Sequence, residues 1–566
     1  MISMERDVPV VNRTPELADC RDKWTFDAQY DCWCLEDVLY TQKADVPKFQ
    51  RLSIFVPAAY LNADGTPNPR GRTQRYTSQN APVVFENNAA GYMQMPHTWL
   101  GGPRCYAEQY LRHGLIYVTC GCRGRESRNA QGQPVGKAPV TLVDFKTAVR
   151  FLRHNRAALP GDWDRIISVG WSAGGAMSAL LAVTGDHPAY DPYLEAAGAF
   201  MDESDAVYAA QIYCPIIDLE HADLAYEWMF RADRTCENSP AGPAETMTPF
   251  KEALSMELSA RYADYVNGLK LRHPETGEPL TLSRDGRSGP FYDYMMRCLS
   301  DSATAFLARL ERGAQPGAPS VQDYLSGNYT FEAPAPMPDA PKELHHAGPG
   351  VTVDAAPQPR MSLGELLSRP PRGEAFVEEK PPMVRRQGPD KRAWLSWDGA
   401  RATVADLDAY VLGHRRRMKP CTSFDKLTND SGENEVFGSA KADFAHFNPV
   451  IGQAAASLRS DFPEEAARYA ADFDVGGDEE LARRAALINP LNFITAEAKP
   501  PQAKRYRIRV GASDADTSLS VSVTLAVMLR NAGYPVDYAL MWDQPHSEAD
   551  LPGEVLQWID SVCDPS

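Results

Sequence analysis

The chain has 566 residues, 43% of them hydrophobic, and carries a formal net charge of -17 at pH 7. This length allows two or more folding units, and the acidic balance argues against a protein that binds nucleic acid through a basic surface. No run of about 18 apolar residues occurs, so we expect no membrane-spanning helix and no membrane partner.

The N-terminus and the cysteines bear on the compartment. The first residues, MISMERDVPVVNRTPELADC, lack the apolar core of a signal peptide, which favours a cytoplasmic protein, with secretion or export to the periplasm after signal removal as the alternative. The 11 cysteines include the pairs Cys32/Cys34 and Cys120/Cys122, and none has the C-x-x-C spacing of a zinc site. We interpret them as thiols of a reducing compartment rather than as disulfides. Nothing in the sequence indicates an oligomeric state.

Residues 1–217 alternate strand and helix patterns, which is typical of a parallel sheet covered by helices. Apolar runs predict strands at 52–57, 82–87, 115–121, 166–170 and 206–216. An apolar period of about 3.6 residues predicts a helix from Leu142 to Leu159, and a second helix follows Trp171.

From residue 218 to residue 495 the pattern changes to helices and loops, with amphipathic helices predicted over 249–269 and 292–312. The stretch 332–389 is rich in proline, glycine and charge, and we interpret it as a long mobile excursion. Its pair His345-His346 is interpreted as solvated rather than as a metal site.

Residues 496–566 return to the sheet pattern. They predict strands at 506–512 and 536–542 and helices at 518–533 and 552–562. An insertion between two sheet-forming segments is typical of an α/β fold with a large, mainly helical lid or cap. We therefore divide the chain into a core at 1–217 and 496–566 and a cap at 218–495.

The motif Gly170-Trp171-Ser172-Ala173-Gly174 follows an apolar strand and precedes a helix, the context that a nucleophile elbow requires. The turn strains the serine backbone, and bulky neighbours would clash with the adjoining strand and helix. The helix N-terminus favours the negative charge that develops during acyl transfer. The alternative is a glycine-rich turn with an inert serine.

A serine nucleophile needs a general base, which an acid orients. His546 follows the strand 536–542, and Asp514 follows the strand 506–512. The order Ser172, Asp514, His546 is that of the α/β-hydrolase fold. Asp516 is the rival acid, and Asp514 is favoured because it lies directly at the strand end.

An oxyanion hole needs two backbone N–H donors. The first candidate is Ala173, directly after the nucleophile. The second should come from the loop after the strand 82–87, where Gly91 is our candidate because a glycine lets the backbone approach the substrate. An ordinary turn is the alternative. No metal or organic cofactor is expected for this chemistry.

Six segments together resemble the bacterial tannases, the tannin acyl hydrolases. They are GWSAGGAMSAL (170–180), YCPIIDLEHADLAYEW (213–228), RMKPCTSFDKL (417–427), GENEVFG (432–438), SDADTSL (513–519) and QPHS (544–547). The resemblance spans most of the chain outside the proline-rich stretch. It implies that Ser172, Asp514 and His546 form the catalytic triad of an α/β-hydrolase.

The resemblance also implies that Lys419, Glu433 and Asp516 bind the hydroxyls of a galloyl ring and that Ile216 packs on the ring face. Carboxylates are acceptors for phenolic O–H groups, and a lysine supplies donors. Each has a structural alternative: Lys419 ends the run RRRMK, which is typical of a solvated face, and Asp516 precedes a helix as an N-cap. Gly432 departs from the family, in which we expect a proline.

These observations predict a serine esterase that hydrolyses galloyl esters, a small-molecule substrate, to gallate and an alcohol. The first alternative is a feruloyl or general carboxylesterase, which shares the triad. The second is a hydrolase fold that binds without catalysis, since a fold alone does not establish an activity. An intact triad argues against the second.

Overall fold

The structure is a computed structural model that describes residues 14–87, 89–102, 105–236, 245–313, 318–328, 330–331, 386–387, 390–494, 502–547 and 549–563. Nearly all of the proline-rich stretch predicted as a mobile excursion, including His345-His346, therefore lies outside the described residues.

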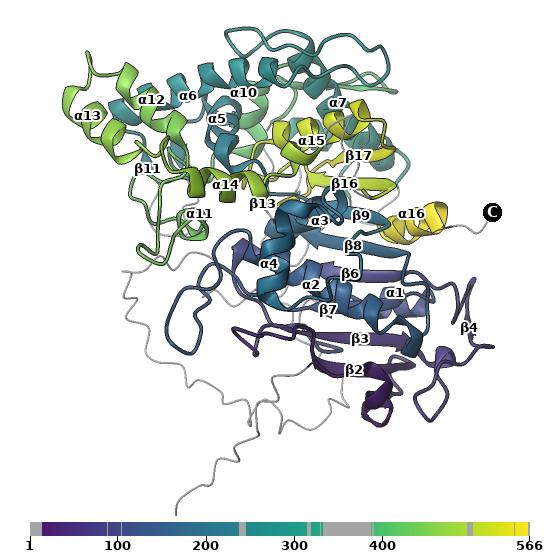
Figure 1. The fold of residues 1–566 in the computed structure, drawn as a ribbon. Coiled ribbons are helices and arrows are strands. Elements are labelled where there is room, and N and C mark those ends of the chain that lie inside the picture. Colours follow the sequence, from purple (N-terminus) through teal and green to yellow (C-terminus); the bar gives the residue numbers. More distant parts are fainter. Residues whose placement is uncertain are drawn as a thin grey trace, which may run out of the picture.

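A nine-stranded sheet forms the centre of the molecule (Figure 1), in the order β1-β2-β3-β7-β6-β8-β9-β16-β17. The pairs from β1 to β7 are antiparallel, and those from β7 to β17 are parallel. Every residue of β6, β7, β8 and β9 is buried, as expected for parallel strands covered on both faces. The strands are β1 (Thr25–Asp27), β2 (Cys32–Leu39), β3 (Arg51–Pro57), β6 (Val83–Asn87), β7 (Ile116–Cys120), β8 (Ile166–Trp171), β9 (Ala209–Tyr213), β16 (Arg505–Gly511) and β17 (Val536–Met541).

The helices form two groups. Figure 1 shows α2, α3 and α4 in front of the sheet, and the teal and green helices α5, α6, α12 and α13 together beyond its β16 side. The predicted α/β fold with a helical insertion is confirmed, while the cap boundaries at 218 and 495 stay predictions. The helices are α1 (Ala107–Arg112), α2 (Val140–His154), α3 (Ala173–Val183), α4 (Asp191–Ala197), α5 (Leu219–Phe230), α6 (Pro249–Gly268), α7 (Pro290–Glu311), α8 (Val321–Ser326), α10 (Leu407–Tyr410), α11 (Gly432–Val436), α12 (Pro449–Ser457), α13 (Pro463–Asp472), α14 (Glu479–Leu487), α15 (Leu519–Asn531) and α16 (Glu554–Cys563).

The sequence did not predict the strands β1 and β2 at the edge of the sheet. In β2 the register with β3 shifts between Leu35 and Val38, where two exposed acidic residues interrupt the apolar alternation. Within the region that we predicted to lack strands, the described residues form three short antiparallel pairs: β10 (Thr235–Cys236) with β11 (Glu245–Thr246), β12 (Thr330–Phe331) with β13 (Arg386–Gln387) and β14 (Leu395–Trp397) with β15 (Ala402–Val404). Strands of two or three residues are too short to show a period.

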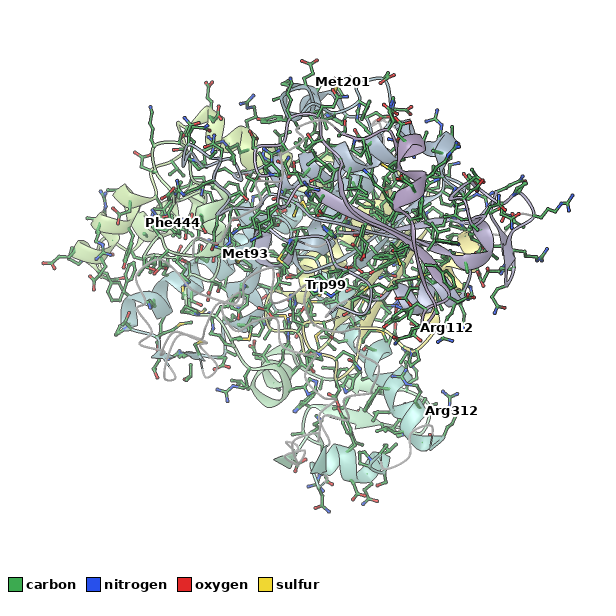
Figure 2. All side chains as sticks on the ribbon, turned by 90° about the horizontal axis from the view of Figure 1, so that it is seen from below. Met93, Trp99, Arg112, Met201, Arg312 and Phe444 are labelled. Carbon is green, nitrogen blue, oxygen red and sulfur yellow. The ribbon has the colours of Figure 1, made fainter. Side chains whose placement is uncertain are left out.

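Side chains fill the space between the elements, and Arg312, after the end of α7, lies on a lobe that projects from the rest of the molecule (Figure 2). All 11 cysteines are free thiols. Among the described residues, no helix combines the length and the apolar character that crossing a bilayer requires.

A buried ion pair holds the segment before Lys419 against α5. The side chains of Arg417 and Glu227 are both 0% exposed and bond to each other. Arg417 also donates from Nε to the carbonyl of Asp233 at 2.9 Å, and its guanidinium lies 5.3 Å from the centre of the Tyr226 ring. Because Lys419 follows Arg417 by two positions, these contacts also hold the backbone of Lys419 in place.

Replacing Arg417 by methionine is expected to lower the free energy of unfolding by about 3–5 kcal/mol, because it leaves the Glu227 carboxylate buried without its partner. Urea denaturation measures the loss. Arg392→Met is the matched control, since the Arg392–Asp390 pair is 66% and 55% exposed and such pairs contribute about 0–1 kcal/mol. Equal losses in both variants would contradict the assignment, and Arg417→Met/Glu227→Met should recover much of the stability.

Candidate active site

Five neighbouring parallel strands, β6, β8, β9, β16 and β17, end at the same edge of the sheet. The loop with Gly91 follows β6, and Ser172 follows β8. Cys214, Asp514 and His546 follow β9, β16 and β17, in that order. Ligands and reacting groups gather at the carboxyl ends of strands in open α/β sheets. The topology therefore brings segments more than 300 residues apart to one place.

Ser172 lies at the sharp turn between β8 and α3. Its backbone has φ 59° and ψ -126°, a strained conformation for a residue with a side chain. The turn is held by hydrogen bonds from Ser172 N–H to the Tyr213 carbonyl at 3.1 Å and from Ile216 N–H to the Ser172 carbonyl at 3.2 Å. A Cβ at Gly170 would lie 2.4 Å from the carbonyl oxygen of Gly174, so this close approach requires a glycine.

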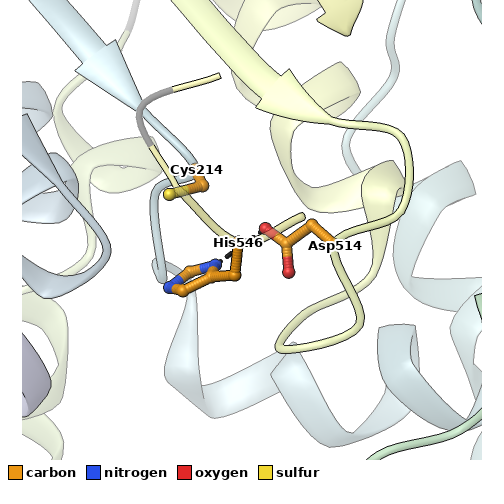
Figure 3. Close-up of side chains that lie close together, drawn as sticks. All are labelled: Cys214, Asp514 and His546. Atoms are coloured by element: carbon orange, nitrogen blue, oxygen red, sulfur yellow. Dashed lines mark hydrogen bonds and ion pairs between the residues drawn. The ribbon is translucent and has the colours of Figure 1, made fainter. Parts of the chain in front are cut away.

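The three residues predicted as a triad are within hydrogen-bond distance of one another. His546 Nε2 lies 2.9 Å from Ser172 Oγ, and His546 Nδ1 lies 2.8 Å from Asp514 Oδ2. Figure 3 shows the Asp514 carboxylate facing the His546 ring. The rival acid, Asp516, is farther away, with Oδ2 3.8 Å from His546 Nδ1. The geometry favours Asp514 as the orienting acid.

A glycine also lets the histidine loop approach the acid. A Cβ at Gly511, the last residue of β16, would lie 2.2 Å from the backbone carbonyls of both Gln544 and Pro545. Any other residue at 511 would push this loop, and His546 with it, away from Asp514.

The charges of the site stabilise a protonated histidine. Burial alone would raise the pKa of Asp514, yet its pKa lies below the ordinary value because it bonds to His546 and lies near the Arg415 guanidinium. Burial by itself would lower the pKa of His546, yet this pKa lies well above the ordinary value, because of the charge of Asp514 first and of Asp516 as well. An imidazolium that forms when His546 accepts a proton is therefore favoured.

Residues 407–415 of the cap hold the acid loop in place. Arg415 is 3% exposed, and two of its nitrogens, Nε and Nη1, have no hydrogen-bond partner within the described part of the chain. His414 pairs at 3.0 Å with Asp543, which lies three positions before His546 in the chain. Tyr410 OH donates to the Ala512 carbonyl, His414 Nε2 lies 3.0 Å from Ser513 Oγ, and Arg415 Nη2 donates to the Thr517 carbonyl. These three residues thus position the loop that carries Asp514.

Ala173 and Gly91, the two candidate oxyanion donors, lie at the ends of neighbouring strands. Ala173 is the first residue of α3, so its N–H has no partner within the helix. Gly91 lies in the 3-10 turn Ala90–Tyr92 with φ 59°. Its carbonyl accepts a hydrogen bond from Arg125 Nε at 3.1 Å, which fixes the orientation of this peptide.

Tyr226, a buried residue of α5, connects the backbone of Lys419 with the backbone next to Asp516. The Tyr226 hydroxyl donates to the Ala515 carbonyl at 3.0 Å and accepts from Lys419 N–H at 2.9 Å. Asp516 N–H donates to Asp514 Oδ1 at 2.8 Å. The structure therefore places both residues next to the loop that carries the acid. The Lys419 ammonium lies 4.1 Å from the centre of the Phe424 ring.

Tyr92 bonds to Ile216 and lies near Glu433. Tyr92 OH donates to the Ile216 carbonyl at 2.8 Å, and Ile216 N–H in turn bonds to Ser172. Burial raises the pKa of the Tyr92 hydroxyl, and the nearby carboxylate of Glu433 raises it further. Main-chain hydrogen bonds thus link Ile216 to Ser172, Asp516 to Asp514 and Lys419 to Tyr226, and Glu433 lies near Tyr92.

Comparisons with known proteins identify relatives of this chain. The BD-FAE family model matches residues 127–227. Esterase LipQ of Mycobacterium tuberculosis is 37% identical over 91 residues, which are 16% of this chain and 20% of the length of that relative. Fusobacterium nucleatum tannase has a TM-score of 0.70 at 26% identity, over 94% of this chain and 95% of that one.

Tannin acyl hydrolase from Lactobacillus plantarum has a TM-score of 0.72 at 30% identity, over 96% of this chain and 98% of that one. The chain belongs to the bacterial tannase family. A tannin acyl hydrolase in complex with ethyl gallate also matches, with a TM-score of 0.70 at 30% identity over 94% of both chains. As a bacterial tannase with the α/β-hydrolase fold, the chain is a carboxylic ester hydrolase.

The interpretation of the RRRMK run as a solvated face is wrong for two of its members in this tannase. Arg415 and Arg417 are 3% and 0% exposed. Tyr92 and Tyr226, which organise the site, were missed at the sequence level, as was the part played by Arg415. Tyr226 and Arg417 do lie in segments that carry the tannase resemblance, which is the signal that could have directed attention to them.

Gly432, where we expected a proline, lies against a guanidinium. A Cβ at this position would lie 2.9 Å from Arg125 Cζ and 3.0 Å from its Nη1. Arg125 also pairs with Glu435 of α11 at 2.6 Å. The space that a side chain at 432 would need is thus taken by an arginine that connects α11 to Gly91.

Proposed function

We propose that this bacterial tannase hydrolyses galloyl esters, either gallotannins or simple alkyl gallates, through a galloyl-serine intermediate. The pair of contacts at His546, 2.9 Å to Ser172 and 2.8 Å to Asp514, carries the proposal of a serine mechanism. The match to a tannin acyl hydrolase in complex with ethyl gallate supports the galloyl group as the acyl part.

In the proposed reaction His546 removes the proton of Ser172 as the hydroxyl attacks the ester carbonyl. Asp514 holds the ring in the tautomer that has Nδ1 protonated and stabilises the imidazolium. The N–H groups of Ala173 and Gly91 receive the oxyanion. The imidazolium then protonates the leaving alcohol, and water activated by His546 releases gallate and restores Ser172.

We propose that Lys419, Glu433 and Asp516 recognise the three ring hydroxyls and that Ile216 packs against the ring face. This assignment is supported by the main-chain bonds of Ile216 to Ser172, of Asp516 to Asp514 and of Lys419 to Tyr226, and by the effect of Glu433 on the pKa of Tyr92. A site built to bond several hydroxyls discriminates strongly against esters that lack them, because its buried polar groups are then left unpaired. We expect kcat/KM for methyl gallate to exceed that for methyl benzoate by about 10⁴-fold.

Glu433→Gln is expected to lower kcat/KM for methyl gallate by about 10–150-fold, the effect of one hydrogen bond to a charged group. Its rate on methyl benzoate should not change, because that ring has no hydroxyl to donate. Parallel kinetics on the two esters measure this difference.

The matched control is Asp430→Asn, which removes the same charge three residues away from a side chain that is 51% exposed. It should affect neither ester. A wild-type protein with similar kcat/KM for both esters would favour the general carboxylesterase instead. Equal losses on both esters in Glu433→Gln would show that Glu433 acts on the fold rather than on the ring.

A further inference from the structure

One reactive side chain at the active site has no role in the proposed reaction. Cys214 follows β9, the strand between those that lead to Ser172 and Asp514. It is 0% exposed, and its Sγ donates to the Ser547 carbonyl at 3.3 Å. Figure 3 shows its thiol and the Asp514 carboxylate both facing the His546 ring.

The three side chains present a sulfur, a nitrogen and an oxygen to a common point. One ligand atom from each of Cys214, His546 and Asp514 lies within 4.8 Å of the other two. Nδ1 is the histidine nitrogen that faces Asp514, at 2.8 Å, so an ion shared with Asp514 would bind Nδ1. Donor atoms around a tetrahedral zinc ion are about 3.3–3.6 Å apart for Zn–S and Zn–N bonds of about 2.3 and 2.0 Å. Binding would therefore require the three side chains to move until their donor atoms reach this spacing.

We propose that Cys214, His546 and Asp514 form a binding site for a borderline or soft divalent cation, with Zn²⁺ and Cd²⁺ as its probes, and that the bound ion switches off hydrolysis. Thiolate and imidazole select such ions, whereas Mg²⁺ and Ca²⁺ prefer sets of oxygen donors.

Proton balance explains why the bound ion inhibits. A thiol coordinates a metal ion as its thiolate, so binding releases the proton of Cys214 to solvent. Coordination of Nδ1 displaces the proton that His546 shares with Asp514, and the neutral ring then carries its proton on Nε2. Nε2 is the atom 2.9 Å from Ser172 Oγ, and a protonated Nε2 cannot accept the serine proton. In addition, Asp514 binds the ion and no longer forms its hydrogen bond to the imidazole.

Binding is measured on the full chain with Ser172→Ala, in which no turnover occurs. We expect calorimetry to show one Zn²⁺ or Cd²⁺ per chain, with a thiolate-to-metal absorption band for Cd²⁺, and no binding of Mg²⁺ or Ca²⁺. Adding Cys214→Ser should weaken the affinity by about 100-fold or more. Cys298→Ser, which removes a half-buried thiol of α7, is the matched control and should change nothing.

Inhibition is measured on the wild-type serine, with each variant compared to its own rate without metal. Cd²⁺ should stop turnover of the wild type and of Cys298→Ser at concentrations that leave Cys214→Ser active. If Cys214→Ser does not fold, His546→Gln is the second test, because it removes another of the three proposed ligands. It should also abolish the absorption band. Unchanged affinity in these variants would overturn the proposal. The inhibition rests on the proposed role of His546 but the binding does not, so failure of one is distinguishable from failure of the other.

Discussion

Ser172→Ala is expected to lower kcat on methyl gallate by about 10⁶-fold, the loss seen when the nucleophile of a triad is removed. The alanine keeps the turn between β8 and α3, and the groups proposed to bind the ring are untouched. Substrate should therefore still bind, with a dissociation constant close to that of the wild type. Release of gallate, followed by chromatography over long incubations, measures the rate, and equilibrium dialysis measures the binding.

The covalent intermediate gives this prediction a second readout. Acid quenching during turnover should trap a galloyl group on Ser172, visible as a mass increase on the peptide that contains it. Ser547→Ala is the matched control, because this residue lies next to His546 in the chain and its hydroxyl donates to the Pro545 carbonyl at 3.4 Å rather than to a member of the triad. Its turnover and labelling should match the wild type. A Ser172→Ala protein with activity within tenfold of the wild type would rule out the serine mechanism.

The central strands and the order of the triad were predictable because both follow from local rules. Buried parallel strands read as apolar runs, and 166–170 and 506–512 each proved to be within a residue or two of β8 and β16. A serine between glycines after such a strand has few structural alternatives. The edge strand β2 was not predictable in this way, because its register shift and its exposed acidic residues remove the alternation on which strand prediction depends.

The supporting groups of the site were not predictable, because they act across long sequence distances. Tyr226 connects Lys419 with Ala515, which lies 289 positions away from it in the chain. Arg415 reads as part of a charged run, yet the fold buries it beside Asp514. A buried polar residue has no periodic signature, since what satisfies it is a partner that only the tertiary structure brings close.

Asp514→Asn is expected to lower kcat by about 10⁴-fold with little change in fold. The asparagine amide donates to Nδ1, so the proton of His546 moves to Nε2, and the ring can no longer accept the proton of Ser172. The wild type needs neutral His546, and Asp514 raises the pKa of that ring. Activity is therefore lost as the pH falls through the raised pKa, and without the carboxylate this loss should move to lower pH. The pH dependence of kcat/KM on methyl gallate measures both effects.

Asp516→Asn is the matched control, because it removes the same charge from the other carboxylate near His546. The Asp516 oxygen lies 3.8 Å from Nδ1, against 2.8 Å for Asp514, which is beyond hydrogen-bond distance. This variant keeps the proton of His546 on Nδ1, so any loss of kcat/KM should come from weaker recognition of the ring hydroxyls. The loss should therefore disappear on methyl benzoate. The Asp514→Asn loss should persist on both esters, because the tautomer governs every acyl transfer at Ser172. If Asp516→Asn instead lost as much activity on methyl benzoate as Asp514→Asn, the two carboxylates would have to exchange roles during the reaction.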